Sequence, residues 1–492
     1  MAIRRNSFVN LASNLVGLVL FAALTPLYFH VIGSERYGIL AIIWVFLSFF
    51  SAFDFGMGAA LTYRVAGESP GDVACQSDFF WTAMCISVPV GLVTGMILFG
   101  MVGGGLGSWF KMTPAISTEL FHSAPALLGI GLCTVLSSTS GGLLRGREYF
   151  VTNAALNALV MALQILLPVL AALLISPSLY ILIPATLAGR LIVVVATIVI
   201  VQTVVLAGAR PSVSRRSARS LIGYGAWSSV AGVIELVISA ADRVIIAAVA
   251  GPGAVGYYSV PSSVLARMMI FPTSLVTAAL PQMTRRSKEE EAVLVAKIVR
   301  MIVMLTPCFV TGMFLARPFL RLWMGSDFAA IATVPMQWLL LAFWMEMIAA
   351  ILFFRLLAQG RPKANAAIAL VMVAPYCLLM YYMAGAWGVA GAAATYCCRN
   401  LFYVIGRAAS TGSRRMLTAA IAPEGATLSA SLAACLIALP CQPPVAVAAI
   451  LIAGSFALAA KRRPPEFDKI ILDLMARLRL VMGIIYSPRG HP

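Results

Sequence analysis

Eight ionisable side chains lie inside long apolar stretches of this sequence, and their chemistry is the first clue to its function. A charge at the centre of a lipid bilayer costs about 2.5–3.5 kcal/mol even on the lenient insertion scale. A membrane segment that keeps such a charge is therefore expected to face a water-filled cavity or a partner of opposite charge. Four of these residues are cationic and four are anionic: Arg190, Arg243, Arg267 and Arg399, and Asp54, Glu235, Asp242 and Glu346.

The arginines predict a site for an anion of the phosphate type, because a guanidinium group can place two hydrogen bonds on one phosphate. Arg190 and Arg399 lie near the middle of their apolar segments, at matching positions in two halves of the chain. We expect this pair to bind the anion, with structural pairing to carboxylates as the alternative. Arg267 and Arg243 are further candidates for the same site.

The carboxylates have two open interpretations, namely coupling to an ion and neutralisation of the arginines. Glu235 and Asp242 are seven residues apart, so they share one helical face and can take a proton or a cation, or form salt bridges. Asp242 and Arg243 are neighbours that project in different directions, so we do not expect them to pair. Asp54 can cap a neighbouring helix, and Glu346 can act as a counter-ion or as a functional group.

Long apolar helices must position these groups. The chain has 492 residues, of which 61% are hydrophobic and 11% are charged, whereas a soluble domain is roughly 45–50% apolar and about 25% charged. A membrane-spanning helix needs about 20 apolar residues. We predict an all-α membrane protein with about fourteen transmembrane helices, at 8–32, 38–63, 79–102, 121–144, 152–175, 179–207, 221–248, 255–280, 293–316, 333–357, 364–384, 388–410, 419–440 and 443–460.

The loop charges predict the orientation, since Lys and Arg are enriched in cytoplasmic loops. With the N-terminus inside, 24 of the 35 Lys and Arg residues fall in inner segments and 4 in outer segments. This distribution places both termini in the cytoplasm. It also accounts for the net charge of +17 without a nucleic-acid partner.

Similar motifs recur along the chain in the same order. Gly33-x-x-x-Tyr37-Gly38 follows the first span, and Gly251 to Tyr257 follows the seventh. Arg190 and Arg399 occupy the sixth and twelfth spans. We therefore predict two six-helix halves related as a parallel repeat, with any substrate path between them. The expected parts are 1–210, 211–411, two extra helices at 412–462 and an amphipathic cytoplasmic tail at 463–492.

Nothing in the sequence predicts catalysis or a bound cofactor. The glycine-rich stretch 103–107 lacks the Lys-Ser/Thr pair of a phosphate loop. The nine cysteines and three histidines show no spacing typical of a metal site. We expect no enzyme activity, no cofactor and no metal, and transport that is downhill or driven by a proton or sodium gradient.

The sequence resembles a known family at several loose motifs. They are Asn10 with Pro26, Gly33 to Gly38, Asp54-Phe55-Gly56-x-Gly58 with Arg64, and Asp242-Arg243 followed by Gly251 and Gly256-Tyr257-Tyr258. These residues are similar to the polysaccharide-transporter branch of the multidrug/oligosaccharidyl-lipid/polysaccharide exporter superfamily, which contains the O-antigen and exopolysaccharide repeat-unit flippases.

This resemblance implies a flippase that moves an undecaprenyl-diphosphate-linked oligosaccharide across the bacterial cytoplasmic membrane by alternating access. The intramembrane arginines would then bind the diphosphate. The implied partners are the lipid-linked oligosaccharide, membrane lipids and the polysaccharide polymerase and export machinery. The alternatives are a multidrug cation/proton antiporter of the same superfamily and a peptidoglycan-precursor flippase. A membrane glycan polymerase or ligase is disfavoured because the outer loops are short.

Overall fold

The structure is a computed structural model of the whole chain. It describes residues 2–52, 56–67, 72–102, 112–269, 272–273, 275–276, 279, 283, 287–437 and 445–461. All regular structure within these ranges is helical, which confirms the all-α prediction. By residue contacts the chain divides into two compact units, Met1–Val264 with Val373–Ala392, and Leu265–Met372 with Ala393–Pro492.

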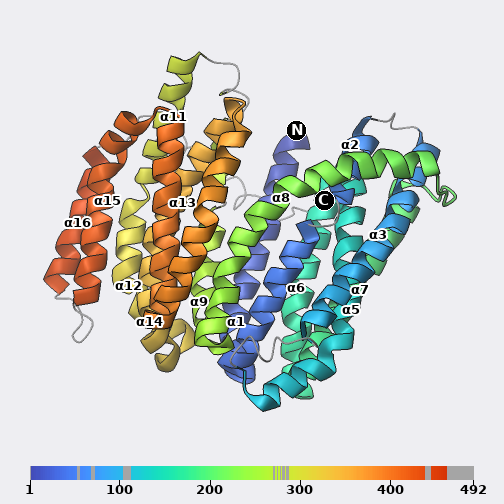
Figure 1. Ribbon diagram of the computed structural model, residues 1–492, viewed down its shortest axis with the longest axis horizontal. Helices are drawn as coiled ribbons and strands as arrows, with labels where there is room; N and C mark the ends of the chain where they lie inside the picture. The colour runs from blue at the N-terminus through green and yellow to red at the C-terminus, as the bar shows by residue number, and fades with distance from the viewer. Residues whose placement is uncertain are drawn as a thin grey trace, which may run out of the picture. The chain divides into compact units, whose positions relative to one another are not determined.

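The first unit contains the helices that carry Arg190 and Arg243 (Figure 1). Helices α3, α5 and α7 pack side by side, and α6 packs against α1 and α7. The N-terminal end of α3 is capped by the Asp72 carboxylate, which accepts a hydrogen bond from the Cys75 N–H at 3.1 Å. The elements are α1 (Ala2–Ala52), α2 (Met57–Gly67), α3 (Val73–Met101), α5 (Pro114–Gly146), α6 (Phe150–Leu174), α7 (Leu179–Ile200), η2 (Val201–Val205), α8 (Arg215–Ala250) and α9 (Pro252–Ala266).

Two glycines of the recurring motif break the helical backbone in the same way. Gly33 interrupts α1 with φ 81° and ψ 164°, and Gly251 separates α8 from α9 with φ 87° and ψ 163°. Both values favour glycine, because a side chain in this region of φ is strained. The two motifs also meet. A Cβ added to Gly38 would lie 1.7 Å from the carbonyl oxygen of Pro252, so only glycine allows this approach.

Close packing in the first unit depends on small residues where α3 crosses α5. A Cβ on Gly131 would lie 2.6 Å from the backbone nitrogen of Gly95, so the two backbones are in near contact. Such contacts are common between membrane helices, because they allow dispersion forces to act over a large area. A core of fully buried apolar side chains, including Leu61, Phe80 and Leu144, joins α2, α3 and α5.

The second unit contains Arg399 and Glu346. Helix α12 packs against α13, α15 and α16. Helix α14 is broken at Trp387 and Gly388, and residues 373–392 around this break belong to the first unit. Ser287 and Glu290 form a capping box at the start of α11. The elements are η3 (Arg267–Met269), α11 (Lys288–Val303), α12 (Thr306–Met324), α13 (Ser326–Ala358), α14 (Pro362–Ser410), α15 (Arg414–Ile437) and α16 (Val445–Lys461).

Eight helices among the described residues are long and apolar enough to cross a membrane. The chain is therefore a multi-pass membrane protein. Two of these helices are unusually long, because α1 has 51 residues and α14 has 49. A helix rises about 1.5 Å per residue, so each could contain more than one crossing of a bilayer core of about 30 Å. The glycine breaks lie at the junctions predicted between spans one and two and between spans eleven and twelve.

Candidate functional site

Arg190 in α7 is bound by two neutral side chains from neighbouring helices. Its Nη1 donates to the Thr134 hydroxyl of α5 at 2.9 Å, and its Nη2 donates to the Gln164 carbonyl of α6 at 2.7 Å. The Nε atom is buried and makes no hydrogen bond to any group that the structure describes. Thr134 in turn donates to the Ile130 carbonyl at 2.8 Å, which leaves its lone pair directed at the guanidinium.

No carboxylate among the described residues forms an ion pair with Arg190. Neutral partners fix the direction of the guanidinium but do not cancel its charge. In a low-dielectric setting this charge remains strongly attractive to an anion. Arg190 is therefore a half-buried cation whose direction is fixed by two neutral side chains, and within the described ranges no acidic group neutralises its charge.

Arg243 and Asp242 are tied together, contrary to the expectation that neighbours on a helix do not pair. The Arg243 Nη1 lies 3.7 Å from the Asp242 Oδ1, and the Arg243 Nε donates to the Ser259 hydroxyl at 3.3 Å. The Tyr258 hydroxyl donates to the Asp242 Oδ2 at 2.9 Å. That expectation was wrong because a long arginine side chain can bend back toward α9, where Ser259 provides an acceptor. Asp242 is buried, with 3% of its surface exposed.

In the second unit, Arg399 and Glu346 are linked through one tyrosine. The Tyr396 hydroxyl donates to the Glu346 Oε2 at 2.6 Å, and the Arg399 Cζ lies 4.0 Å from the centre of the Tyr396 ring. Arg399 also donates to the Asn400 Oδ1 at 3.4 Å, and the Asn400 amide donates to the Ala342 carbonyl at 2.9 Å. A cation over an aromatic face is attracted by the ring quadrupole, so Tyr396 positions both charged groups.

The structure says less about the three remaining residues that the sequence analysis proposed for the site. Arg267 is half-buried and lies in η3, where α9 tightens into a short 3-10 turn. Asp54 lies outside the described residues. The backbone of Glu235 belongs to α8, but its side chain is also outside what the structure describes. The roles assigned to these three residues stay predictions.

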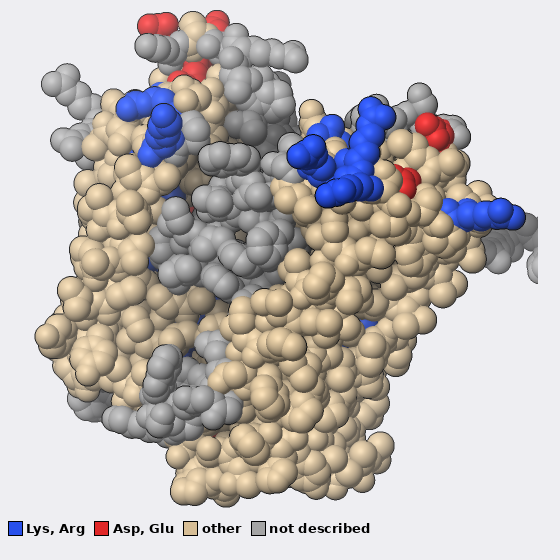
Figure 2. Space-filling view, turned by 45° about the vertical axis from the view of Figure 1, so that its right-hand side comes forward, with Lys and Arg blue, Asp and Glu red and all other residues tan. Residues whose placement is uncertain are grey.

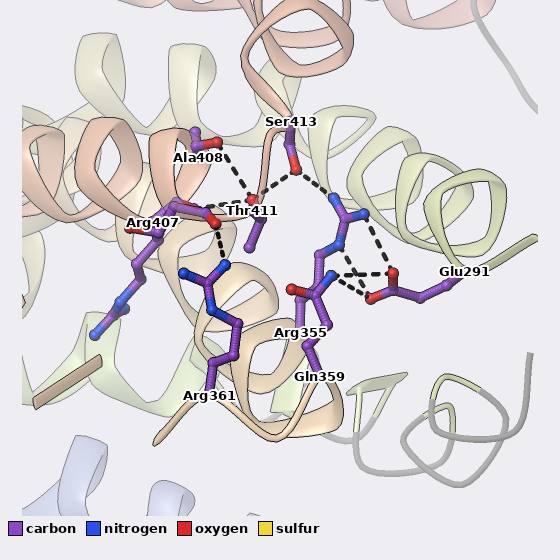
Figure 3. A network of polar contacts seen from close by, with 9 residues as sticks. Glu291, Arg355, Gln359, Arg361, Arg407, Ala408, Thr411 and Ser413 are labelled. Atoms are coloured by element: carbon purple, nitrogen blue, oxygen red, sulfur yellow. Dashed lines mark hydrogen bonds and ion pairs between the residues drawn. The ribbon is translucent and has the colours of Figure 1, made fainter. Parts of the chain in front are cut away.

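A buried ion pair at one end of the second unit was missed by sequence reasoning. Figure 3 shows Arg355 of α13 between Glu291 of α11 and Ser413. Its Nε donates to Glu291 at 3.1 Å, and its Nη1 donates to the Ser413 hydroxyl. Gln359 donates to both Glu291 oxygens at 3.1 Å. Arg361 extends the network by donating to the Ser410 carbonyl at 2.6 Å.

This network joins α11, α13 and the end of α14 and is structural in character. Glu291 and Arg355 are 3% and 5% exposed, so the pair is fully desolvated. Glutamates 289–291 form the acidic first turn that favours the start of a helix. No local signal shows that the third of them turns inward to meet α13.

An ion pair between helices of the first unit was also not predicted from the sequence. Arg36 of α1 makes a bidentate pair with Glu119 of α5, at 2.9 and 2.6 Å. The same carboxylate accepts the Leu179 N–H at 3.0 Å, at the start of α7. Glu119 thus joins three helices at the end of the unit that contains the Gly33 break.

Comparisons with known proteins place this arrangement in a family. A family model described as "Polysaccharide biosynthesis protein" matches residues 31–333, which is more than half of the chain. The chain belongs to this family. The family description agrees with the resemblance to polysaccharide transporters that the sequence motifs indicated.

Similar proteins are transporters and flippases rather than enzymes. A "Putative O-antigen transporter" of Shigella flexneri is 26% identical over 183 residues, which cover 37% of this chain and 44% of that protein. The match thus spans less than half of that transporter. The fold is similar to that of the lipid II flippase MurJ in an inward closed conformation, with a TM-score of 0.68 and 13% identity. The match covers 92% of this chain and 97% of the MurJ chain.

The same fold also occurs in a multidrug exporter. An inward-facing MATE family transporter of the MOP superfamily matches with a TM-score of 0.63 and 14% identity, over 84% of this chain and 98% of that one. At these identities the two solved structures show the fold alone. The charged residues of this member of the polysaccharide biosynthesis family must therefore carry the argument about its substrate.

Proposed function

We propose that this chain is a flippase that moves an undecaprenyl-diphosphate-linked oligosaccharide from the inner to the outer leaflet of the bacterial cytoplasmic membrane. The observation that carries the proposal is Arg190. Its guanidinium is directed by Thr134 and Gln164, and none of the carboxylates that the structure describes pairs with it. A diphosphate supplies the missing negative charge and enough oxygens for a forked contact.

The proposed architecture has fourteen spans, with two six-helix halves at 1–210 and 211–411 that alternate access to the two sides. Support comes from the similar backbone angles at Gly33 and Gly251 and from the motifs around them. The two extra helices at 412–462 and the tail at 463–492 complete this architecture. Arg399, in the other half of the chain, is proposed as the second diphosphate contact, with Arg267 and Arg243 as further contacts.

Orientation and energy source follow from charge placement. The Lys and Arg distribution supports cytoplasmic N- and C-termini. A proton or sodium gradient is proposed to drive the cycle, with Glu346, Asp242, Glu235 and Asp54 as the candidate ion-coupling or counter-ion groups. Polysaccharide polymerase and export proteins are proposed as partners.

A cation antiporter is the main competing function, and Arg190 argues against it. An unneutralised arginine repels a cationic drug, whereas it attracts a diphosphate. A peptidoglycan-precursor flippase shares the diphosphate lipid, so only the glycan distinguishes it.

The test is transport by the full chain in proteoliposomes with three labelled cargoes. These are a polyprenyl-diphosphate oligosaccharide, a lipid II analogue and an organic cation dye. Movement of the oligosaccharide lipid in preference to the other two supports the proposal. Proton-driven dye efflux without lipid movement would replace it with the antiporter, and preference for the lipid II analogue would replace it with the precursor flippase.

A further inference from the structure

The segment between η2 and α8 is fixed rigidly to the neighbouring helix α3. Side chains of α3 and η2 hold both its backbone and its serines. Two side chains bind backbone carbonyls, since Gln202 donates to Ala209 at 2.7 Å and Ser77 donates to Arg210 at 3.1 Å. The Ser212 and Ser217 hydroxyls donate to the two carboxylate oxygens of Asp78, at 3.1 and 2.6 Å. The Ser214 N–H donates to the Thr82 hydroxyl at 3.0 Å. The segment is therefore a fixed surface and not a loosely tethered linker.

This fixed segment and the first turns of α8 together present four arginines to the outside. Arg210, Arg215, Arg216 and Arg219 are all exposed, and none of them pairs with a carboxylate that the structure describes. Figure 2 shows a group of Lys and Arg side chains near the top of the view, with acidic side chains beside it, above a flank that is mostly tan. Asp78 of α3, which contacts this segment, accepts hydrogen bonds from the Ser212 and Ser217 hydroxyls.

Apolar side chains accompany the arginines on the same face. Arg215, Arg219 and Ile222 are spaced i, i+4 and i+7 along α8, so they lie on one side of its first two turns. Ile222 is 50% exposed, and Val213 just before the helix is 63% exposed. Arginine beside exposed aliphatic side chains is the pattern of a surface that lies at the membrane interface, with the cations at the phosphate level.

We propose that this arginine surface, made of Arg210, Arg215, Arg216, Arg219, Val213 and Ile222, binds the phosphate groups of anionic phospholipids in the adjoining leaflet. The guanidinium groups contact the lipid phosphates, while Val213 and Ile222 reach the upper acyl chains. Phospholipid is the occupant that the charge and the apolar residues favour together, because a free phosphate would make no use of the aliphatic side chains. The inference does not depend on which cargo the chain transports.

The test is a titration of the full chain, in a nonionic detergent, with short-chain phosphatidylglycerol. Arg215→Gln/Arg219→Gln removes two charges at i, i+4 spacing from the arginine surface. The matched control is Arg317→Gln/Arg321→Gln, which removes two exposed arginines with the same spacing from α12. Each arginine near an anionic membrane surface is worth about a fivefold change in affinity. The first variant should therefore raise the Kd for phosphatidylglycerol about 25-fold, and the control should change it less than about twofold.

Three further arms make the result decisive. Short-chain phosphatidylcholine should bind weakly to wild type and to both variants, because it has no net negative charge. Inorganic phosphate should not compete at concentrations where phosphatidylglycerol saturates; effective competition would mean an anion site and would overturn the lipid proposal. The Arg215→Lys/Arg219→Lys variant keeps both positive charges and should therefore keep most of the affinity for phosphatidylglycerol. It is the variant to measure if the glutamine variant does not fold. Equal losses in the test and control variants, or no loss in either, would also overturn it.

Discussion

Replacing Arg190 by glutamine should leave the protein folded and only slightly less stable than the wild type. The change removes hydrogen bonds from the charged guanidinium to Thr134 and Gln164, each with a net value of about 1.5–3 kcal/mol. It also removes a charge that costs about 2.5–3.5 kcal/mol at membrane depth. These two terms largely offset each other, so the free energy of unfolding should fall by only about 1–2 kcal/mol.

Arg355→Gln is the informative contrast. That change leaves the Glu291 carboxylate buried without its cation, and breaking a buried pair costs about 3–5 kcal/mol. Unfolding of both variants and the wild type in mixed detergent micelles of increasing SDS fraction measures the difference. A loss above about 3 kcal/mol in Arg190→Gln would refute the reasoning, because Arg190 would then be a structural residue with a hidden anionic partner.

Three further changes test the packing and the second unit. Gly38→Ala should destabilise the protein by more than about 2 kcal/mol, because the added Cβ would overlap a backbone carbonyl of α9. Gly100→Ala is the control, because its Cβ would have no other atom within 4 Å, and it should be nearly neutral in a thermal melt. Glu291→Gln should cost about 3–5 kcal/mol in the same melt, and a cost below about 1 kcal/mol would show that its arginine partner is not desolvated. Tyr396→Phe keeps the ring over Arg399 and should retain more transport than Tyr396→Leu, which removes the ring; equal rates would deny the ring a positioning role.

The all-helical character of the chain could be predicted from sequence, because the length of an apolar stretch is a property of contiguous residues. The glycine motifs at Gly33 and Gly251 also marked two real breaks in the helices. The partners of the charged groups could not be predicted in the same way. Thr134 and Gln164 are common residues on two other helices, and only the packing of α5, α6 and α7 brings them to Arg190.

The same limit explains the wrong and missed interactions. The pairing of Asp242 with Arg243 depends on where α9 supplies Tyr258 and Ser259 after the turn at Gly251. A helical wheel of α8 alone contains none of this information. Interactions that span several helices depend on tertiary packing, and they are the ones that sequence periodicity leaves open.

The most direct test of the central claim is the translocation rate of one labelled polyprenyl-diphosphate oligosaccharide by wild type and by Arg190→Gln in matched proteoliposomes. The exposed Arg321→Gln variant is the charge-matched control. If Arg190 contacts the diphosphate, the Arg190→Gln rate should fall at least about tenfold while the control remains near wild type, because a charged hydrogen bond is worth about 1.5–3 kcal/mol. Equal rates in all three proteins would contradict the account.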